Sequence, residues 1–585
     1  MLLLSKRVVL FLTLHLFHEV VLGSKMNHRR VLTQQGYVRG IRQDIQTNNG
    51  QAKTVYKFLG VPYVEKPIGD LRFKPPQALS TRRSSDYDAT SVRPICMQDE
   101  YYFDSIRGAW PEFDPKRDMS EDCLYLNIYT QSTRGKKKYP VIFYIHGGGY
   151  FSGSPTRDTS PGEYLPTRGV VLVTIQYRLG PFGFFTTGDS EAPGNVGLLD
   201  QVEALKWVQR NIEGFGGDKN SVTLLGESAG GSSVGLHYLS PLSRGLFHRG
   251  IAVSGVDLCP FAHKPKSTVL EYSKELVRKV NCSKATSRQI LQCLKSVSSA
   301  TFFNNRIYWL MQPFVDQRFL PDEPKILRKR GKFHKLPLMS GFVSQEGSFV
   351  VDLYSKNYNT TYNSTGLGEY LDNVFLPIEY NCKKDKAYVA YNALKFQYTP
   401  WDDLNNRAMF RHKLTEMWSD YFFIAPTDAA LTIHSDHGDP TYMFEFAHRS
   451  RYHPKPEWMG VIHEDTTAYK FGLPLLNSKT RLKFDKKDKK VSDMVVTMFT
   501  NFAKFGNPTP RRARGLKWDN FDSSKKAYLK IKENSVMTSK YHPLRMAFWN
   551  SYFLTLLPKK PLPPSGGKDS VVSDAAVNMN YGKLN

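Results

Sequence analysis

The sequence lacks several features that would assign it to a particular class of protein. After the amino-terminal segment, no run reaches the roughly 20 apolar residues that a transmembrane helix needs. The chain contains no internal repeats, and its carboxyl end lacks the hydrophobic stretch that a lipid-anchor signal requires. We therefore expect no membrane span, and the 41% hydrophobic content is typical of a globular protein.

Acidic residues are also few: 54 Asp and Glu stand against 80 Lys and Arg, for a formal net charge of +26. The basic residues form scattered clusters at 134–138, 328–332, 481–490 and 511–514. None of these clusters shows the regular interleaving with aromatic residues that is typical of a nucleic-acid-binding surface. We expect no nucleic acid partner and a solvated basic surface, which leaves weak binding to acidic glycans or anionic membranes open.

The amino terminus predicts a signal peptide over residues 1–23. A positively charged start precedes a short apolar core (Val8–Phe17), and small Gly23 offers a cleavage point. Three glycosylation sequons agree with a secreted, extracellular protein: Asn281, Asn359 and Asn363. We expect residues 24–557 to form one large domain, and the polar residues 558–585 to form a disordered tail.

Strands and helices are expected to alternate along the chain. Apolar runs at 139–148 and 169–178 predict strands that are covered on both faces. An amphipathic segment at 197–212 predicts a helix between the second run and a third strand at 221–226. This order predicts an α/β fold with a large, mostly parallel central sheet flanked by helices.

The stretch Gly-Glu-Ser-Ala-Gly at 226–230 follows the third predicted strand. Gly-x-Ser-x-Gly between a strand and a helix is typical of a nucleophile elbow, a tight turn that presents a serine. Ser228 is thus a candidate nucleophile, although an ordinary surface turn uses the same residue types. Backbone N–H groups of Gly148, Gly149 and Ala229 are candidates for an oxyanion hole, because consecutive glycines let such groups turn towards one point.

Several long motifs in the expected order resemble the type-B carboxylesterase/cholinesterase family of α/β-hydrolases. The segments "FGGDKNSVTLLGESAGG" (215–231) and "EDCLYLNIYTQ" (121–131) are similar to its two signature stretches, and the likeness runs from about Val31 to about Thr555. The resemblance, closest in kind to secreted, insect-type carboxylesterases, implies an α/β-hydrolase fold. It also implies hydrolysis of carboxylic esters, with a small-molecule substrate and without a cofactor or metal.

The resemblance assigns an acid and a base to complete the site. The acid of the family lies in Glu-Gly-Ser, which is Glu346 here, and the base lies in Gly-x-x-His-x-[Asp/Glu], which is His463. The chain order of Ser228, Glu346 and His463 is the order expected for this fold. His437 is rejected as the base, because it precedes the predicted strand (440–446) that the family's histidine loop follows.

Four neighbouring positions bear on these roles. Ser254 matches the family serine that supports the catalytic carboxylate, and Glu227 lies beside the nucleophile. Glu464 follows the base where the family usually has Gly, and Gln345 precedes the acid where Asp or Glu is frequent. Neither departure removes a catalytic group, but both leave the rate and the pH optimum open.

Phe113, Phe261 and Phe349 match pocket positions of the family. True cholinesterases hold a quaternary ammonium group against a tryptophan at the position of Phe113, and tryptophan is the best cation–π partner. We therefore expect apolar neutral esters as substrates and a choline ester as a poor one. The alternatives are a cholinesterase-like or juvenile-hormone-esterase-like specialist, or an adhesion or binding protein with this fold. The sequence does not determine the oligomeric state.

The six cysteines allow many pairings, and composition does not choose among them. The resemblance implies a bridge between Cys96 and Cys123 that closes the loop over the active-site gorge. We expect a second bridge between Cys282 and Cys293. By its family position Cys259 is expected to be a buried thiol, whereas Cys382 is left either free or paired between chains.

Overall fold

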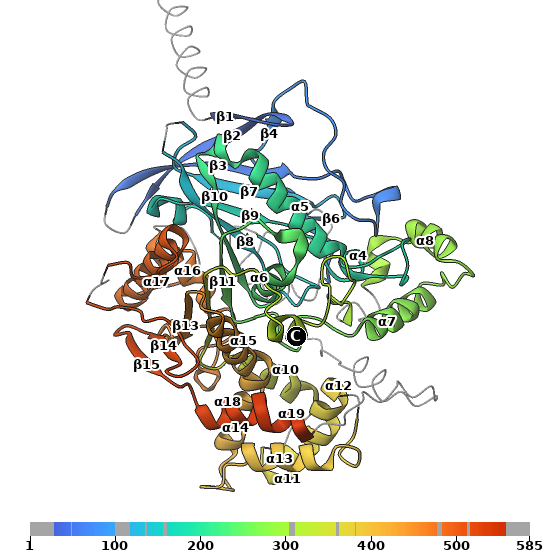
Figure 1. Ribbon diagram of the computed structural model, residues 1–585, viewed down its shortest axis with the longest axis vertical. Coiled ribbons are helices and arrows are strands. Elements are labelled where there is room, and N and C mark those ends of the chain that lie inside the picture. The colour runs from blue at the N-terminus through green and yellow to red at the C-terminus, as the bar shows by residue number, and fades with distance from the viewer. Residues whose placement is uncertain are drawn as a thin grey trace, which may run out of the picture.

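The computed structural model of the protein covers most of the chain (Figure 1). The described residues are 28–47, 50–99, 118–134, 137–155, 161–303, 310–358, 362–380, 382–476, 482–511 and 515–556. The predicted signal peptide, Phe113, Asn359 and the predicted tail lie outside them. Within these ranges, no helix is both long enough and apolar enough to cross a membrane.

One large sheet runs through the molecule. In the described part of the chain it has 13 strands, in the spatial order β1-β2-β3-β7-β9-β8-β10-β11-β12-β13-β14-β15, with β4 beside β2. The strand bounds are β1 (His28–Thr33), β2 (Gly36–Gln46), β3 (Ala52–Pro62), β4 (Tyr87–Asp88), β7 (Tyr125–Thr130), β8 (Tyr139–Ile145), β9 (Val171–Ile175), β10 (Gly217–Glu227), β11 (Arg249–Val253), β12 (Leu338–Val343), β13 (Thr441–Phe446), β14 (Ala527–Ile531) and β15 (Val536–Ser539). A small second sheet pairs β5 (Ile95–Cys96) with β6 (Met119–Ser120).

The middle of the large sheet is parallel, whereas both of its edges are antiparallel. Every neighbouring pair from β9 to β14 runs parallel. The pairs from β1 to β9 through β2, β3 and β7 run antiparallel, and so does the pair β14–β15. The predicted α/β fold with a mostly parallel central sheet is confirmed, and the antiparallel edges are additions that the sequence analysis did not identify.

Alternate residues of the central strands face opposite sides of the sheet and enter two apolar cores. In β8, Phe143 belongs to one core and Ile142 to the other, and Leu224 and Leu225 of β10 divide in the same way. This alternation is the geometry of a strand. It explains why the predicted strands are continuous apolar runs: a strand that is covered on both faces needs an apolar residue at every position.

Helices cover both faces of the sheet (Figure 1). Their bounds are α4 (Gly180–Phe184), α5 (Val196–Asn211), α6 (Ala229–Leu239), α7 (Lys266–Lys279), α8 (Ser287–Ser296), α9 (Pro324–Lys329), α10 (Ser348–Tyr358), α11 (Ser364–Tyr370), α12 (Leu376–Tyr380), α13 (Tyr388–Tyr398), α14 (Arg407–Ser419), α15 (Ala425–Asp436), α16 (Thr466–Lys470), α17 (Lys486–Phe505), α18 (Pro543–Ala547) and α19 (Phe553–Leu556). Helices α5 and α6 pack into one core and α17 into the other. The helix predicted between the second and third strands is confirmed as α5.

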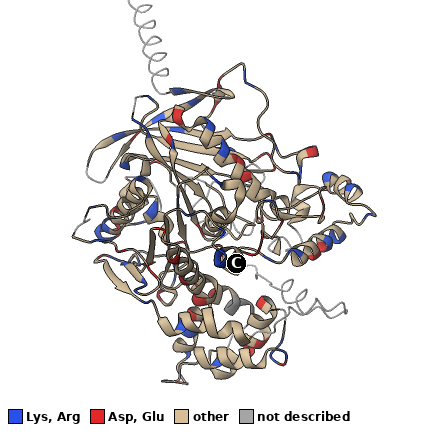
Figure 2. Ribbon diagram, in the orientation of Figure 1, with Lys and Arg blue, Asp and Glu red and all other residues tan. Residues whose placement is uncertain are grey.

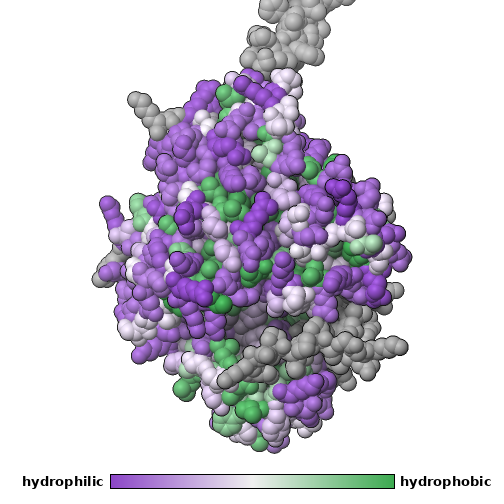
Figure 3. Space-filling view, turned by 45° about the vertical axis from the view of Figure 1, so that its right-hand side comes forward, coloured by the Kyte–Doolittle hydropathy of each residue, from purple (hydrophilic) through white to green (hydrophobic). Residues whose placement is uncertain are grey.

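The segments from α10 to α15, with α18 and α19, form a mainly helical end of the molecule (Figure 1). Hydrophobic residues are visible on the surface of this end in Figure 3. The exposed large apolar or aromatic side chains of these segments include Tyr388, Val389, Phe396, Trp401, Leu544 and Tyr552. Basic and acidic residues are interspersed over the ribbon (Figure 2). The charge is therefore spread over the molecule, as the scattered basic clusters of the sequence predict.

Candidate active site

Ser228 lies on a sharp turn between a strand and a helix. Strand β10 ends at Glu227 and α6 begins at Ala229, so Ser228 is the single residue between them. Its φ of 58° and ψ of −124° are values that residues other than glycine rarely adopt, and such a conformation persists only where the surroundings impose it. One such restraint is the N–H of Ser228, which donates to the Val253 carbonyl at the end of β11, at 2.9 Å.

Two glycines let the turn close. A Cβ on Gly226 would lie 2.1 Å from the carbonyl oxygen of Gly230, and a Cβ on Gly230 would lie 2.1 Å from the carbonyl oxygen of Ile145. Both distances are far shorter than any contact that a side chain tolerates. The Gly-x-Ser-x-Gly spacing therefore reflects a steric requirement, because α6 must pass directly over the ends of β8 and β10.

The glycine loop after β8 lies against this turn. A Cβ on Gly147 would be 2.6 Å from the Glu227 carbonyl oxygen and 2.9 Å from the Ser228 Cβ. Gly148 and Gly149 have φ of 102° and 61°, in the region that favours glycine. Ala229 is the first residue of α6, so its N–H has no partner within the helix. Backbone N–H donors from the loop and the helix thus border the serine.

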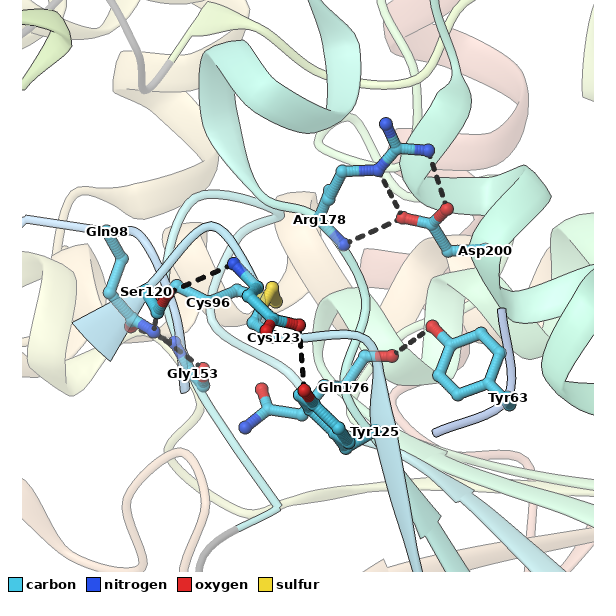
Figure 4. Close-up of a disulfide and its surroundings, with 11 residues drawn as sticks. Tyr63, Cys96, Gln98, Ser120, Cys123, Tyr125, Gly153, Gln176, Arg178 and Asp200 are labelled. Atoms are coloured by element: carbon cyan, nitrogen blue, oxygen red, sulfur yellow. Dashed lines mark hydrogen bonds and ion pairs between the residues drawn. A yellow bond between two sulfur atoms is a disulfide. The ribbon is translucent and has the colours of Figure 1, made fainter. Parts of the chain in front are cut away.

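The glycine loop is tied to the disulfide-bonded segment (Figure 4). Gln98 donates from Nε2 to the Gly153 carbonyl at 2.9 Å and accepts from the Gly153 N–H at 2.7 Å. Two residues before Gln98, Cys96 forms the disulfide with Cys123. The covalent bridge and this pair of hydrogen bonds hold the loop in place, so its N–H groups need little ordering when a ligand binds.

Glu346 and His463 form a buried pair. Glu346 follows β12, is 0% exposed, and accepts from the Val343 N–H on Oε1 at 2.9 Å. His463 lies in the loop after β13, and its Nδ1 is 2.6 Å from Oε2 of Glu346. Because one carboxylate oxygen is held by the backbone, the other is fixed on the imidazole. This bond sets the tautomer, with the proton on Nδ1 and the lone pair on Nε2.

The pKa of His463 reflects opposing effects. Burial lowers the pKa of the imidazole, but the Glu346 carboxylate favours the charged form through its field and its hydrogen bond, and Glu464 and Asp465 act in the same sense. The net result is a pKa of His463 above its ordinary value. The residue is therefore a stronger base than an isolated imidazole, and it gains a proton at higher pH.

The segment that follows His463 is attached to the residue before Ser228. Thr466 and Thr467, at the start of α16, donate from Oγ1 to the two oxygens of Glu227 at 2.7 and 2.5 Å. These bonds join positions that are 239 and 240 residues apart in the chain. The fold thus brings the base loop onto the elbow, although the sequence separates them widely.

Gln345 joins the acid loop to the base loop. Its N–H donates to the Val461 carbonyl at 3.0 Å, and its Oε1 accepts from the Val461 N–H at 2.8 Å. The two loops approach closely at Gly460, where φ is 64°. A Cβ on Gly460 would lie 2.3 Å from Oε1 of Gln345. A glutamine at this position, noted above as a departure from the family pattern, has a defined structural task here.

The contact that the resemblance implies for Ser254 is not seen. Ser254 has a φ of 50°, and its N–H donates to the Gly341 carbonyl of β12 at 2.7 Å. Its Oγ is buried and has no hydrogen-bond partner among the residues that the structure describes. The hydroxyl therefore makes no bond to Glu346 here, and the residue acts through its backbone, which links the ends of β11 and β12.

Residues 27–549 match the model of the carboxylesterase family. The chain belongs to the carboxylesterase family. It is 33% identical to neuroligin-2 of Mus musculus over 576 residues, which cover 89% of this chain and 67% of that protein. It is 32% identical to acetylcholinesterase of Bungarus fasciatus over 558 residues, which cover 92% of this chain and 88% of that protein.

In this member of the carboxylesterase family, aromatic rings surround the imidazole. Phe349 stacks on His463 with ring centroids 5.1 Å apart, and Phe423 lies 4.7 Å from the same ring. Phe261 packs against Phe423 at 5.3 Å and against Phe422 at 6.0 Å. Phe349 is 37% exposed although it is apolar, so one of its faces borders open space next to the base. The imidazole of His463 therefore has aromatic rings beside it in addition to the Glu346 carboxylate.

Phe261 and Phe349 were predicted from the sequence, whereas Phe422 and Phe423 were not. Both missed residues lie in the π-helical segment η8 (Asp420–Ile424), between α14 and α15. The run "DYFFI" is an aromatic pair within a long helical stretch, which is more typical of a core than of a pocket. Only the packing of this segment against His463 distinguishes it.

The two predicted disulfides, Cys96–Cys123 and Cys282–Cys293, are present. Cys259 is a buried free thiol as expected, and burial raises its pKa. Cys382, which the sequence left undecided, is also a buried free thiol.

Two of the three sequons can be examined. Asn281 is exposed, whereas Asn363 accepts from the Gly366 N–H at 2.7 Å and caps α11. In the part of the chain that the structure describes, no group of His, Cys, Asp or Glu side chains is arranged to hold a metal ion.

Proposed function

We propose that this member of the carboxylesterase family is a secreted serine hydrolase that cleaves carboxylic esters through an acyl-serine intermediate. The observation that carries the proposal is the buried Glu346–His463 pair, with an Nδ1–Oε2 distance of 2.6 Å, on a loop that is bonded to the strained Ser228 turn. A residue pair of this kind activates a weak nucleophile.

Acylation follows from the proton positions. A serine hydroxyl is barely ionised near neutral pH, so His463 accepts the proton from Ser228 as the oxygen attacks the ester carbonyl. Glu346 orients the imidazole and stabilises the imidazolium that forms, without taking the proton itself. His463 then gives the proton to the departing alkoxide, and the alcohol leaves. The acyl group remains on Ser228.

The negative charge of the tetrahedral intermediate needs donors. Gly148, Gly149 and Ala229 offer backbone N–H groups beside the serine, and losing one such donor typically costs about 10²–10³ in rate. In the second half of the reaction, water takes the place of the alcohol, and His463 removes its proton. As the acyl–oxygen bond breaks, His463 returns this proton to the Ser228 oxygen, so the carboxylic acid is released and the serine is regenerated. None of these steps calls for a metal or a cofactor.

An apolar and uncharged substrate fits the surroundings best. The rings of Phe261, Phe349 and Phe423 supply an apolar wall next to the base, and such walls suit apolar acyl or alcohol groups. The sequon at the exposed Asn281 supports a secreted protein. The proposed partner is therefore a small neutral ester outside the cell.

Labelling with a fluorophosphonate probe tests the proposal directly. We expect the probe to attach to Ser228, with the modified peptide identified by mass spectrometry. Pre-treatment with the probe should abolish hydrolysis of a short p-nitrophenyl ester. A protein that remains unlabelled, or that is labelled at another serine, contradicts the assignment.

A non-enzymatic binding protein is the second candidate. The chain is 33% identical to neuroligin-2, whose name does not denote an enzyme, and 32% identical to acetylcholinesterase. The net charge of +26 makes an acidic glycan the first partner to test. Retention on heparin at physiological salt, together with absent probe labelling, would favour this candidate over the esterase.

A further inference from the structure

Lys470 is a buried lysine beside the nucleophile elbow. It ends α16, and its Nζ forms an ion pair with the carboxylate of Glu227, the residue before Ser228. The exposed fractions of the two side chains are 0% and 2%. Lysine is rarely buried without a partner, because removing an ammonium group from water is costly. Burial lowers the pKa of Lys470 well below its ordinary value, and the adjoining Glu227 carboxylate is the counter-ion that favours the charged form.

The pair belongs to a closed hydrogen-bond network. Glu227 also accepts from the hydroxyls of Thr466 and Thr467, and Lys470 donates from Nζ to Oγ1 of Thr467 at 3.1 Å. Both carboxylate oxygens thus have hydroxyl donors in addition to the ammonium group. With these donors, the ionised form of the carboxylate is favoured.

Besides these polar partners, two aromatic rings border the buried ammonium group. The ring centroids of Tyr144 and Phe471 lie 5.8 and 5.7 Å from Nζ of Lys470. Charges in such an environment are screened much less than charges in water, so their fields reach neighbouring atoms. A net charge at this position would be felt at Ser228.

The other carboxylates near the base are differently engaged. Glu346 is bonded to His463, and Asp465 is bonded to Nε2 of His453 at 2.9 Å. Glu464 adjoins His463 in the chain and acts on that imidazole, whose pKa its charge raises. Glu227 is therefore the buried carboxylate whose charge at the nucleophile depends on one counter-ion.

We propose that Lys470 determines the charge preference of the site, because it neutralises Glu227 and so removes the attraction that a bare carboxylate would exert on a cationic alcohol group. This inference rests on the proposed ester hydrolysis. Lys470 touches no reacting atom in this scheme; it is a specificity-determining residue that acts through Glu227.

The test compares two thioesters of the same shape and different charge. Acetylthiocholine carries a trimethylammonium group where S-(3,3-dimethylbutyl) thioacetate carries a tert-butyl group, so the ratio of their kcat/KM values reports the charge. Lys470→Met leaves Glu227 without its counter-ion, and we expect the ratio to rise about tenfold in favour of the cation. Glu227→Gln leaves the ammonium group uncompensated, and the ratio should fall by about the same factor.

The double variant Glu227→Gln with Lys470→Met restores neutrality, and its ratio should return to that of the unchanged protein. Lys57→Met is the matched control, because Lys57 forms another buried ion pair, with Glu163, on a strand separated from β10 by β7, β9 and β8. We expect that variant to lose stability without any change in the ratio.

A purely structural role for Lys470 predicts a different pattern. Both single variants would then lower kcat/KM for both thioesters equally, and the unchanged ratio would overturn the proposal. Thermal melting of each variant identifies loss of folding. If Lys470→Met does not fold, the comparison of Glu227→Gln with the double variant still measures the effect of the lysine charge.

A binding experiment separates this inference from the proposed function. In a Ser228→Ala background, calorimetry measures the affinities for choline and for 3,3-dimethylbutanol, and Lys470→Met should shift their ratio towards choline. If the affinity ratio shifts towards choline but the unchanged protein hydrolyses no ester, the proposed esterase activity is rejected and the inference about Lys470 stands. Hydrolysis with an unchanged ratio would reject the charge inference alone.

Discussion

Two histidines flank strand β13, and their surroundings differ. His463 follows the strand and bonds to the buried Glu346. His437 precedes the strand at the end of α15, is exposed, and directs Nδ1 towards the Ile433 carbonyl at 2.9 Å. The ring of Phe333 packs against it at 5.1 Å. His437 thus has the contacts of a turn histidine, as the sequence predicts, with no carboxylate among its described hydrogen-bond partners.

Strand direction explains the difference. Strands β8, β10, β12 and β13 are parallel. The loops that follow them therefore meet on one side of the sheet, at the carboxyl ends of the strands. The glycine loop, Ser228, Glu346 and His463 all lie in such loops. His437 precedes β13 and therefore lies at the amino ends of the strands. From there it cannot join the loops at the carboxyl ends.

The largest expected effect is that of Ser228→Ala. Hydrolysis of a short p-nitrophenyl ester should fall by about 10⁴-fold or more, because the group that forms the acyl intermediate is removed. The melting temperature should hardly change, since the substitution deletes one hydroxyl. Steady-state kinetics and calorimetric melting check both statements, and substantial residual turnover in a pure sample would contradict the assignment.

Glu346→Gln comes next. An amide leaves the geometry but neither stabilises the imidazolium nor enforces the tautomer, so kcat should drop by about 10³–10⁴. The carboxylate raises the pKa of His463 against the effect of burial, so the variant should have a lower pKa at His463. The base must be neutral to act, and the acidic limb of the remaining kcat/KM profile should therefore move to lower pH. A limb that stays in place would show that Glu346 does not control this titration.

Gln345→Ala should have a smaller effect. It removes the Oε1 acceptor of the Val461 N–H, a bond typically worth about 1 kcal/mol, and loosens the base loop. We expect kcat to fall about tenfold with KM nearly unchanged. Gln345→Glu retains an acceptor oxygen and serves as the control, which should recover most of the rate. Equal losses in the two variants would exclude the bond to Val461 as the cause.

The smallest effect is expected for His437→Ala. The ring is exposed and lies at the amino ends of the strands, so kcat/KM should change less than about twofold, and the free energy of unfolding by about 0.5 kcal/mol or less. Parallel assays of His463→Ala, expected to be nearly inactive, complete the comparison. Similar losses in both variants would refute the choice of His463 as the base.

Much of the candidate site could be predicted from local patterns. Ser228 follows a strand on a turn that needs glycines at 226 and 230 for steric reasons. This requirement produces a short motif that can be recognised in the sequence. Glu346 and His463 also follow strands, but the family resemblance selected them as the candidate acid and base. The same resemblance assigned the supporting role to Ser254, whose buried hydroxyl has no partner in the described structure.

Contacts between distant segments could not be predicted. The hydrogen bonds of Gln345 to Val461, the packing of Phe423 on His463 and the pairing of Lys470 with Glu227 all depend on how helices and loops pack over the carboxyl ends of the parallel strands. No local pattern distinguishes such a lysine or phenylalanine from one on a surface or in a core. Their partners lie many residues away in the chain, so the signal appears only in three dimensions.

The sequence by itself determined the α/β class and the position of the Gly-x-Ser-x-Gly turn, because these follow from apolar periodicity and from steric demands on a single turn. The acid, the base and the Cys96–Cys123 bridge were implied by the family resemblance. The tertiary structure alone decided which side chains meet at His463 and that Lys470 pairs with Glu227. Hydrogen bonds and ion pairs depend on separations of a few ångströms between remote segments, and only the packed fold sets those separations.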